Sequence, residues 1–180
     1  MLLFAFLASG FIFINRDKIT YVGSVDIVEV DCAKREEILK EAYESDQLNR
    51  TTDIPFKEAV KQDHRNKELV ISIIEKCGFP SLKEVSQNSM DAIWTILQHS
   101  SKKHRKKYFP QIEAATKNGD LSKARYATMK DRVLMDEYKP QIYGTQIKKG
   151  KLYKLESPET VNDRRAEMGM KPIEEYLMQF

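Results

Sequence analysis

The chain has 180 residues, of which 41% are hydrophobic and 32% are charged, and its mean hydropathy is −0.55. This balance excludes a polytopic membrane protein and argues against a disordered chain, while the length suits one domain. A net charge of +3 gives no general attraction to nucleic acid, and two cysteines cannot form a disulfide-rich scaffold.

The first predicted element is an uncharged apolar run from Leu2 to Ile14. It is shorter than the roughly 20 residues of a membrane-spanning helix but matches the apolar region of a signal peptide. We therefore predict that residues 1–30 are a signal-like or anchor-like segment with its lead-in. The protein is then periplasmic or tethered to a membrane. The alternatives for residues 2–14 are a buried strand or a mis-assigned start codon. If these residues belong to the core, the protein is cytoplasmic.

Cys32 and Cys77 are the two cysteines of the chain. In an exported protein they could form a disulfide, but their distance along the chain carries no information about the geometry of a bridge. We expect two free buried thiols.

From residue 31 to residue 180 we predict a single helical domain, because apolar residues recur at helical spacing between plain start and stop signals. Ser81 and Glu84 have the spacing of a capping box, and Gly78-Phe79-Pro80 and Asn118-Gly119 end helices. The predicted helices run over about 31–48, 55–77, 81–100, 110–117, 122–138 and 157–169, with a short last one from Pro172.

One β-hairpin is predicted late in the chain, at about 141–155. Residues 141–147 and 152–155 are rich in β-branched and aromatic side chains and flank a turn that contains Gly150. The predicted fold class is therefore mostly α: a single-domain bundle of about six helices with one late β-hairpin.

Four of the predicted helices place an ionisable residue where packing calls for an apolar one. These residues are Asp46, Asp63, His99 and Asp131, each three, four or seven positions from apolar neighbours. Burial of an unpaired charge is costly, so they should pair with one another or with arginines. Such a cluster is either a structural network that fixes helix register or the floor of a polar pocket.

These residues fall within short strings that also suggest a family. The chain resembles an uncharacterised bacterial family, one of the numbered domain-of-unknown-function families, found in part as exported proteins. The resemblance covers about residues 39–177 and implies no catalytic residues, because the family has no assigned reaction. The strings are Asp46-Gln47-x-x-Arg50, Asp63-x-x-Asn66, Gly78-Phe79-Pro80, Gln98-His99, Asp131-Arg132, Gln141-x-Tyr143-Gly144-Thr145-Gln146 and Arg164-Arg165.

The leading functional hypothesis is a pocket for a small anionic or polar ligand, and a hydrolase is its enzymatic form. His99 would be the acid or base because its ordinary pKa is near 6.5, with Asp63 and Asp131 as its catalytic partners. The alternative is a non-enzymatic interaction or immunity-type module with a structural polar cluster. The predicted ligand-binding residues are Asp46, Gln47, Arg50, Asn66, Gln98, Arg132, Gln141, Tyr143, Thr145, Gln146, Arg164 and Arg165.

No metal ligands are predicted. Asp46, Asp63, His99 and Asp131 would suit Mg, Mn or Fe, but the arginines of the strings oppose a cation. No particular cofactor is indicated, and the oligomeric state is undetermined.

The basic run at 102–107 is expected to be a solvated helix start. The alternatives are binding of an acidic surface, an anionic lipid or nucleic acid, of which nucleic acid is the least expected.

Overall fold

The computed structural model describes residues 11–13, 20–22, 24–51 and 53–179. Helices dominate this part of the chain and one hairpin lies late in it, so the predicted mostly α class is confirmed. The elements are β1 (Phe11–Phe13), β2 (Thr20–Val22), η1 (Cys32–Lys34), α1 (Arg35–Thr51), α2 (Phe56–Cys77), α3 (Gln87–His99), α4 (Lys102–Lys117), α5 (Lys123–Asp136), β3 (Ile147–Lys148), β4 (Lys151–Leu152), η2 (Pro158–Thr160), α6 (Val161–Glu167) and α7 (Ile173–Leu177).

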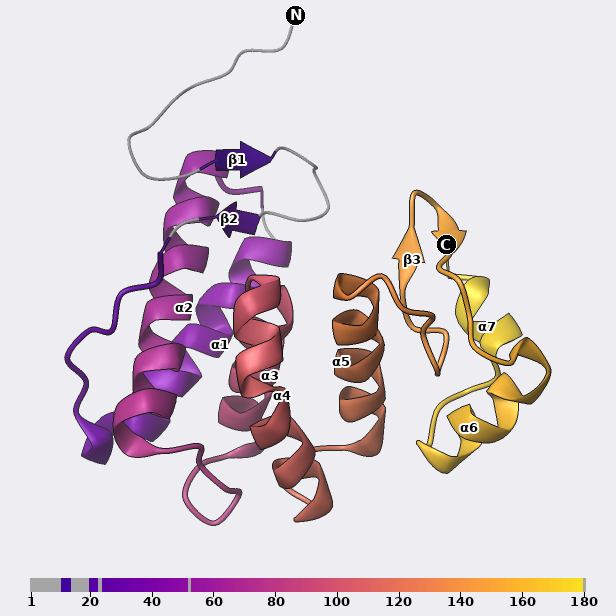
Figure 1. The fold of residues 1–180 in the computed structure, drawn as a ribbon. Coiled ribbons are helices and arrows are strands. Elements are labelled where there is room, and N and C mark those ends of the chain that lie inside the picture. Colours follow the sequence, from indigo (N-terminus) through magenta and orange to yellow (C-terminus); the bar gives the residue numbers. More distant parts are fainter. Residues whose placement is uncertain (1–10, 14–19, 23, 52, 180) are drawn as a thin grey trace, which may run out of the picture. The chain divides into compact units, whose positions relative to one another are not determined.

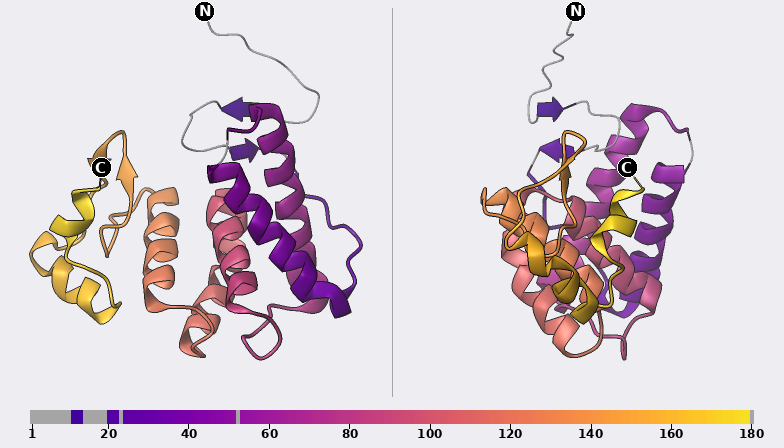
Figure 2. Two further views of the ribbon diagram at one scale, coloured as in Figure 1. Left: turned by 180° about the vertical axis from the view of Figure 1, so that it is seen from behind. Right: turned by 90° about the vertical axis from the view of Figure 1, so that its right-hand side faces the viewer.

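The chain forms two compact units, residues 1–101 and residues 102–180. In the first unit α1, α2 and α3 pack side by side (Figures 1 and 2). Each of these helices has a buried apolar stripe whose members are three, four or seven residues apart. The core of the first unit includes Leu39, Ala42, Val70, Ile73, Ile93 and Leu97.

A disulfide joins Cys32 in η1 to Cys77 at the end of α2, with 5.6 Å between the two Cα atoms. The expectation of two free thiols is therefore wrong. The segment before η1 lies along α2, where the backbone N–H of Val28 donates to Ser72 Oγ at 2.9 Å. This path brings the two cysteines together, although they are distant in the sequence.

The predicted start of α3 at Ser81 is wrong. Ser81 and Glu84 do form the expected pair, since the N–H and Oγ of Ser81 both donate to Glu84 Oε2, at 3.0 and 3.1 Å. This pair closes only a turn. Ser86 caps the helix instead: its Oγ accepts from the backbone N–H of Ser89 at 3.3 Å.

The second unit begins with α4 and α5, which pack against each other (Figure 1). α4 begins at Lys102, and Pro110 lies inside it, so the predicted helix start at Pro110 is wrong. Proline removes one backbone donor, and the rest of the helix continues across it. The basic run 102–107 is therefore a helix start, as expected. Ser122 caps α5, as its Oγ accepts from the N–H of Arg125.

After α5 the chain forms the loop 141–146, the β3–β4 hairpin and the short helices α6 and α7. Ile147 pairs with Leu152 and Lys148 with Lys151, which confirms the predicted late hairpin. A separate bridge joins Gln141 to Leu155, so the two ends of this region are held together.

The predicted signal or anchor segment, residues 2–14, lies outside the described residues except for β1. β1 pairs with β2 in an antiparallel manner. Within the described ranges, none of the helices has the length and hydropathy needed to cross a bilayer. Export and membrane tethering stay predictions.

Candidate functional site

The second unit gathers half of the predicted ligand-binding residues around the loop 141–146, and Asp131 lies at the centre of this arrangement. The Asp131 side chain, on α5, is fully buried. Its carboxylate accepts the backbone N–H groups of Ile142 at 2.7 Å, Tyr143 at 3.1 Å and Thr145 at 3.0 Å. It also accepts the Thr145 hydroxyl at 2.9 Å. Both carboxylate oxygens are thus occupied by donors of the protein itself.

Burial raises the pKa of the Asp131 carboxyl, and the hydrogen bonds from residues 142–145 oppose that rise. Because the donors are backbone N–H groups that cannot turn away, the loop needs an acceptor at this position. The carboxylate therefore sets the shape of the loop.

Two arginines hold the carbonyl side of the same loop. Arg164 Nε donates to the carbonyl of Ile142 at 2.9 Å, and its Nη2 donates to the carbonyls of Glu156 and Ser157. Arg165 is 1% exposed, and its Nη1 donates to the carbonyl of Tyr143 at 2.7 Å. Asp131 thus binds the N–H groups of the loop and the arginines bind its C=O groups.

The two glutamines of the string fix the ends of the loop. The Gln141 side chain accepts from the N–H of Gln146 at 2.7 Å and donates to the carbonyls of Gln146 and Tyr153. Gln146 Nε2 donates to Thr145 Oγ1 at 2.9 Å and to the carbonyl of Thr128 at 3.3 Å. Both side chains make their bonds inside the protein.

Gly144 allows the loop to pass close to α7. It has φ +70°, and a Cβ atom on it would overlap Ile173 Cδ1. The left-handed backbone conformation favours glycine at this position, and a larger residue would also force the end of the Ile173 side chain to move. Tyr176 of α7, which the sequence analysis did not select, donates its hydroxyl to the carbonyl of Thr145 at 2.9 Å.

Arg132, unlike Arg164 and Arg165, does not bind the loop. No hydrogen bond or ion pair of Arg132 is present among the described residues, and its Nε is buried without an acceptor. Burial lowers the pKa of Arg132, the like charge of Arg105 adds to this, and Asp136 opposes it. Arginine nevertheless stays charged, so Arg132 is a cation with free donors.

The first unit holds the remaining predicted residues in a different arrangement. Asp63 pairs with Lys67 on the same helix, with 3.3 Å between Lys67 Nζ and Asp63 Oδ2, and both side chains are buried. Asn66 Nδ2 donates to the carbonyl of Ala42 at 3.4 Å and so links α2 to α1. Lys67 was missed by the sequence analysis, although its position four residues after Asp63 is the spacing of a helical ion pair.

Asp46 is buried on α1, and its Oδ2 accepts from Gln47 Nε2 at 3.3 Å. Gln98 is buried and His99 is half-buried at the end of α3. The Arg50 side chain lies outside the described residues.

The predicted catalytic residues come from both units, His99 and Asp63 from the first and Asp131 from the second. A pocket shared by all three stays a prediction. Within the described ranges, no group of three or more His, Cys, Asp or Glu residues could hold a metal ion.

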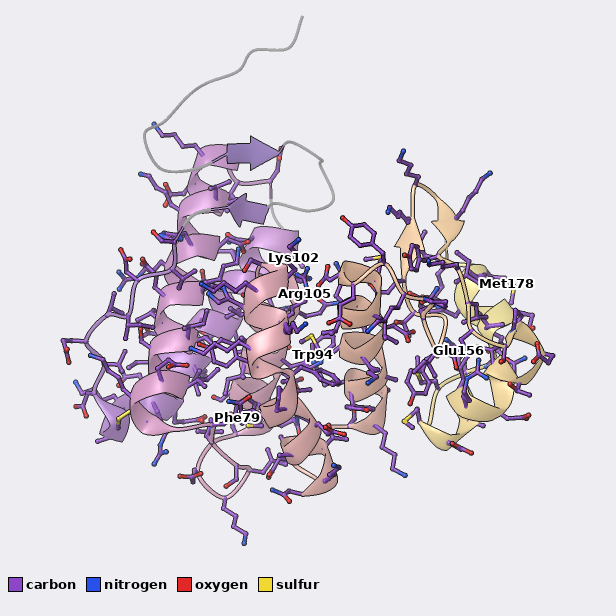
Figure 3. The ribbon with its side chains drawn as sticks, viewed as in Figure 1. Phe79, Trp94, Lys102, Arg105, Glu156 and Met178 are labelled. Atoms are coloured by element: carbon purple, nitrogen blue, oxygen red, sulfur yellow. A yellow bond between two sulfur atoms is a disulfide. The ribbon has the colours of Figure 1, made fainter. Side chains whose placement is uncertain are left out.

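A surface hollow of about 270 Å³ lies in the second unit, where α4 begins and α5 ends. Lys102 and Arg105 are at this end of α4 (Figure 3). The lining residues are Lys102, Lys103, Lys106, Val133, Asp136 and Glu137. None of them was selected as a site residue from the sequence, although the basic run was noted as a possible binding surface.

Comparison with known proteins places this chain in a family. The model of DUF6624, a family of unknown function, matches residues 23–180. This match covers most of the chain, including most of the first unit and all of the second, so the chain belongs to DUF6624. No curated protein and no solved structure matches the chain.

Proposed function

We propose that this member of DUF6624 is an exported, non-enzymatic binding domain for a small anionic or polar ligand. In this proposal the polar residues of the Gln-x-Tyr-Gly-Thr-Gln region are structural. The observation that carries it is the set of donors around Asp131, which come from the backbone and side chains of residues 142–145.

A hydrolase that uses Asp131 would need a carboxylate oxygen that is available to a substrate or to His99. The Asp131 side chain is fully buried, and the loop occupies both of its oxygens. The arginines that could have bound an anionic substrate, Arg164 and Arg165, donate to backbone carbonyls instead. These contacts favour the binding module over the enzyme.

Export is supported by the Cys32–Cys77 disulfide together with the apolar run at residues 2–14. Disulfides persist mainly in oxidising compartments such as the bacterial periplasm. Alkylation of thiols in intact cells tests this point. The two cysteines should resist alkylation until a reductant is added, and labelling without reductant would contradict export.

The central experiment compares the thermal stability of Asp131→Asn with that of the parent protein. The amide places an N–H₂ group among N–H donors, so we expect a loss of about 3 kcal/mol. For a chain of this length that loss lowers the melting temperature by roughly 10 °C. Asp163→Asn, an exposed position on α6, is the matched control and should leave the melting temperature nearly unchanged.

The opposite result would favour the enzyme. Residues of functional sites often cost stability, so a variant that lacks a catalytic carboxylate commonly keeps or gains stability. If Asp131→Asn melts at or above the temperature of the parent protein, the carboxylate is not a structural acceptor and the proposal fails.

A further inference from the structure

The β3–β4 hairpin and the residues after it carry a cluster of positive charge that no carboxylate balances. Four of the seven residues 148–154 are lysines, and all four are exposed. The stretch 138–155 contains no Asp or Glu. Within the described ranges, none of the four lysines forms an ion pair. The members of this lysine cluster are Lys148, Lys149, Lys151 and Lys154.

The carboxylates that flank this stretch are used elsewhere or lie away from the turn. Glu137 is bound by two lysines outside the cluster. Glu156 follows Leu155, which bridges to Gln141 at the base of the hairpin, so Glu156 lies at the end away from the turn (Figure 3). The lysine cluster is therefore not neutralised by the described part of the protein.

Two of the lysines also oppose each other across the hairpin. Lys148 of β3 is the register partner of Lys151 of β4. Like charges at directly opposed positions destabilise a hairpin, whereas opposite charges at the same positions stabilise it. The hairpin thus carries a repulsion that costs stability, as residues of functional surfaces often do. An anion bound by both lysines would relieve that repulsion.

The turn of the hairpin is an open tip on a fixed base. Lys149 and Gly150 have φ of 53° and 71°, as in the two-residue turns that match the twist of paired strands. A Cβ atom on Gly150 would meet nothing within 4 Å. At the base, the Gln141 side chain bonds the backbone of Gln146 and Tyr153. The tip projects beyond the end of α5 (Figures 1 and 2), so it suits an extended surface better than an enclosed molecule.

We propose that the lysine cluster docks on the surface of a bilayer that contains anionic lipid. Lysines are hydrated point charges on flexible stems, and a cluster of about four to eight basic residues is typical of contacts with anionic headgroups. Residues 147–155 contain no arginine, the residue type that binds a single phosphate through paired donors. The Tyr153 ring, 5.6 Å from Lys148 Nζ, adds an aromatic group of the kind found at bilayer interfaces.

This docking goes beyond the proposed ligand binding, and it rests on the proposed export for access to the bilayer. The apolar run at residues 2–14, if it is an anchor, would keep the chain beside the same bilayer. The lysine cluster would then fix the second unit against the headgroups.

The test is co-sedimentation of the full chain with vesicles at low ionic strength. One set of vesicles contains equal parts of phosphatidylglycerol and phosphatidylcholine, and the other contains phosphatidylcholine alone. We expect binding to the anionic set that falls steeply as salt is added. Binding through the apolar run 2–14 would be equal on both sets. Equal binding to the two sets, or no binding to the anionic set, overturns the proposal.

Competition separates a bilayer from other anionic partners. Polyglutamate and single-stranded DNA are each added at a total charge equal to that of the anionic lipid. We expect the protein to stay on the vesicles, because a surface contacts all sides of the tip and a single polymer contacts one line of charges. Release by polyglutamate would indicate an acidic protein partner and release by DNA a nucleic acid, and either result overturns the proposal.

Variants then locate the binding. Each lysine near an anionic bilayer contributes about a fivefold factor, so Lys148→Gln/Lys151→Gln should weaken binding about 25-fold. Lys117→Gln/Lys123→Gln is the matched control, with the same change of charge at the turn between α4 and α5, the other end of α5 from the hairpin (Figure 1). Equal weakening in the control would show that net charge drives the binding and would overturn the proposal.

Lys148→Glu keeps the test independent of unfolding. It places opposite charges at the register pair with Lys151, so the melting temperature should be kept or raised while vesicle binding falls. If this variant binds anionic vesicles as the parent protein does, the proposal fails. Vesicle binding depends neither on the Asp131→Asn result nor on thiol alkylation in cells, so failure here leaves the proposed function standing.

Discussion

The two compact units of this chain are stabilised in different ways. The first packs apolar stripes of three helices together and adds a disulfide between η1 and α2. The second uses buried polar side chains that bind the backbone of an irregular loop, with Asp131 on its N–H groups and Arg164 and Arg165 on its carbonyls. A cluster of buried polar residues can therefore serve loop geometry as well as catalysis.

The two units also differ in the interaction partners of their buried carboxylates. In the first unit Asp63 meets a side chain, that of Lys67. In the second, Asp131 meets mainly backbone donors. Side-chain pairs can be replaced together by apolar residues, but backbone N–H groups cannot be removed and must keep an acceptor.

The largest effect that separates the units is expected from loss of the disulfide. Cys32 and Cys77 are 45 residues apart, and a cross-link over such a loop stabilises a protein by about 4 kcal/mol in the chain-entropy model. The variant Cys32→Ser/Cys77→Ser should therefore lose stability in the first unit. Urea denaturation measures the loss, and hydrogen exchange by mass spectrometry assigns it to peptides.

Peptides from α1 and α2 should exchange faster in this variant, while peptides from 141–146 keep their protection. Reductant should destabilise the parent protein but have no effect on the double serine variant, which is the control. Equal loss of protection in the loop would show that the two units do not differ in this way.

The next largest effect is expected at Gly144. An alanine at this position must adopt a left-handed backbone conformation, and its Cβ contacts Ile173. Together these effects should lower the free energy of unfolding by about 2 kcal/mol. Gly150→Ala is the matched control, because Gly150 has φ +71° but nothing within 4 Å of the added Cβ. Thermal unfolding of both variants should show the larger loss for Gly144→Ala.

The difference between the two alanine variants isolates the contact with Ile173 from the cost of the backbone conformation. Equal losses would mean that α7 moves away freely, and the loop would then be held less tightly than its hydrogen bonds indicate.

The smallest effect concerns Glu137, on the rim of the hollow. Hydrogen bonds from Lys139 and Lys106 lower its pKa to about 2. A lowered carboxyl pKa gives stability that is present above the ordinary value near 4.5 and is lost as pH falls through about 2. Because both lysine partners of Glu137 are exposed, solvent screening keeps this contribution small.

An NMR titration of the Glu137 carboxyl should show it still ionised at about pH 3. Lys106→Gln and Lys139→Gln should each raise the midpoint, and Lys123→Gln should leave it unchanged. A midpoint near 4.5 in the parent protein would show that the two lysines do not pair with Glu137 in solution.

Much of the fold follows from local signals in the sequence. Pro55 before α2, Ser122 before α5 and Gly150 in the late turn mark their elements as predicted. The start of α3 was misplaced because the Ser81–Glu84 pair satisfies the same capping pattern while closing only a turn. Two candidate caps within a few residues cannot be ranked without the packing of the helix that follows.

The candidate site was less predictable, because residue types do not reveal what a polar side chain binds. The burial of Asp131 could be predicted from its apolar neighbours on α5, but its backbone partners could not. The disulfide was missed because the path of residues 24–31 along α2 depends on long-range contacts such as that of Val28 with Ser72.

The bonds to Asp131 also bear on the order of folding. The backbone donors Ile142, Tyr143 and Thr145 follow the carboxylate by 11, 12 and 14 residues. Contacts so close along the chain need little loop closure, so they can form early and quickly. During synthesis, this loop can take shape as soon as α5 and the next few residues have left the ribosome, before α6 and α7 exist to hold it.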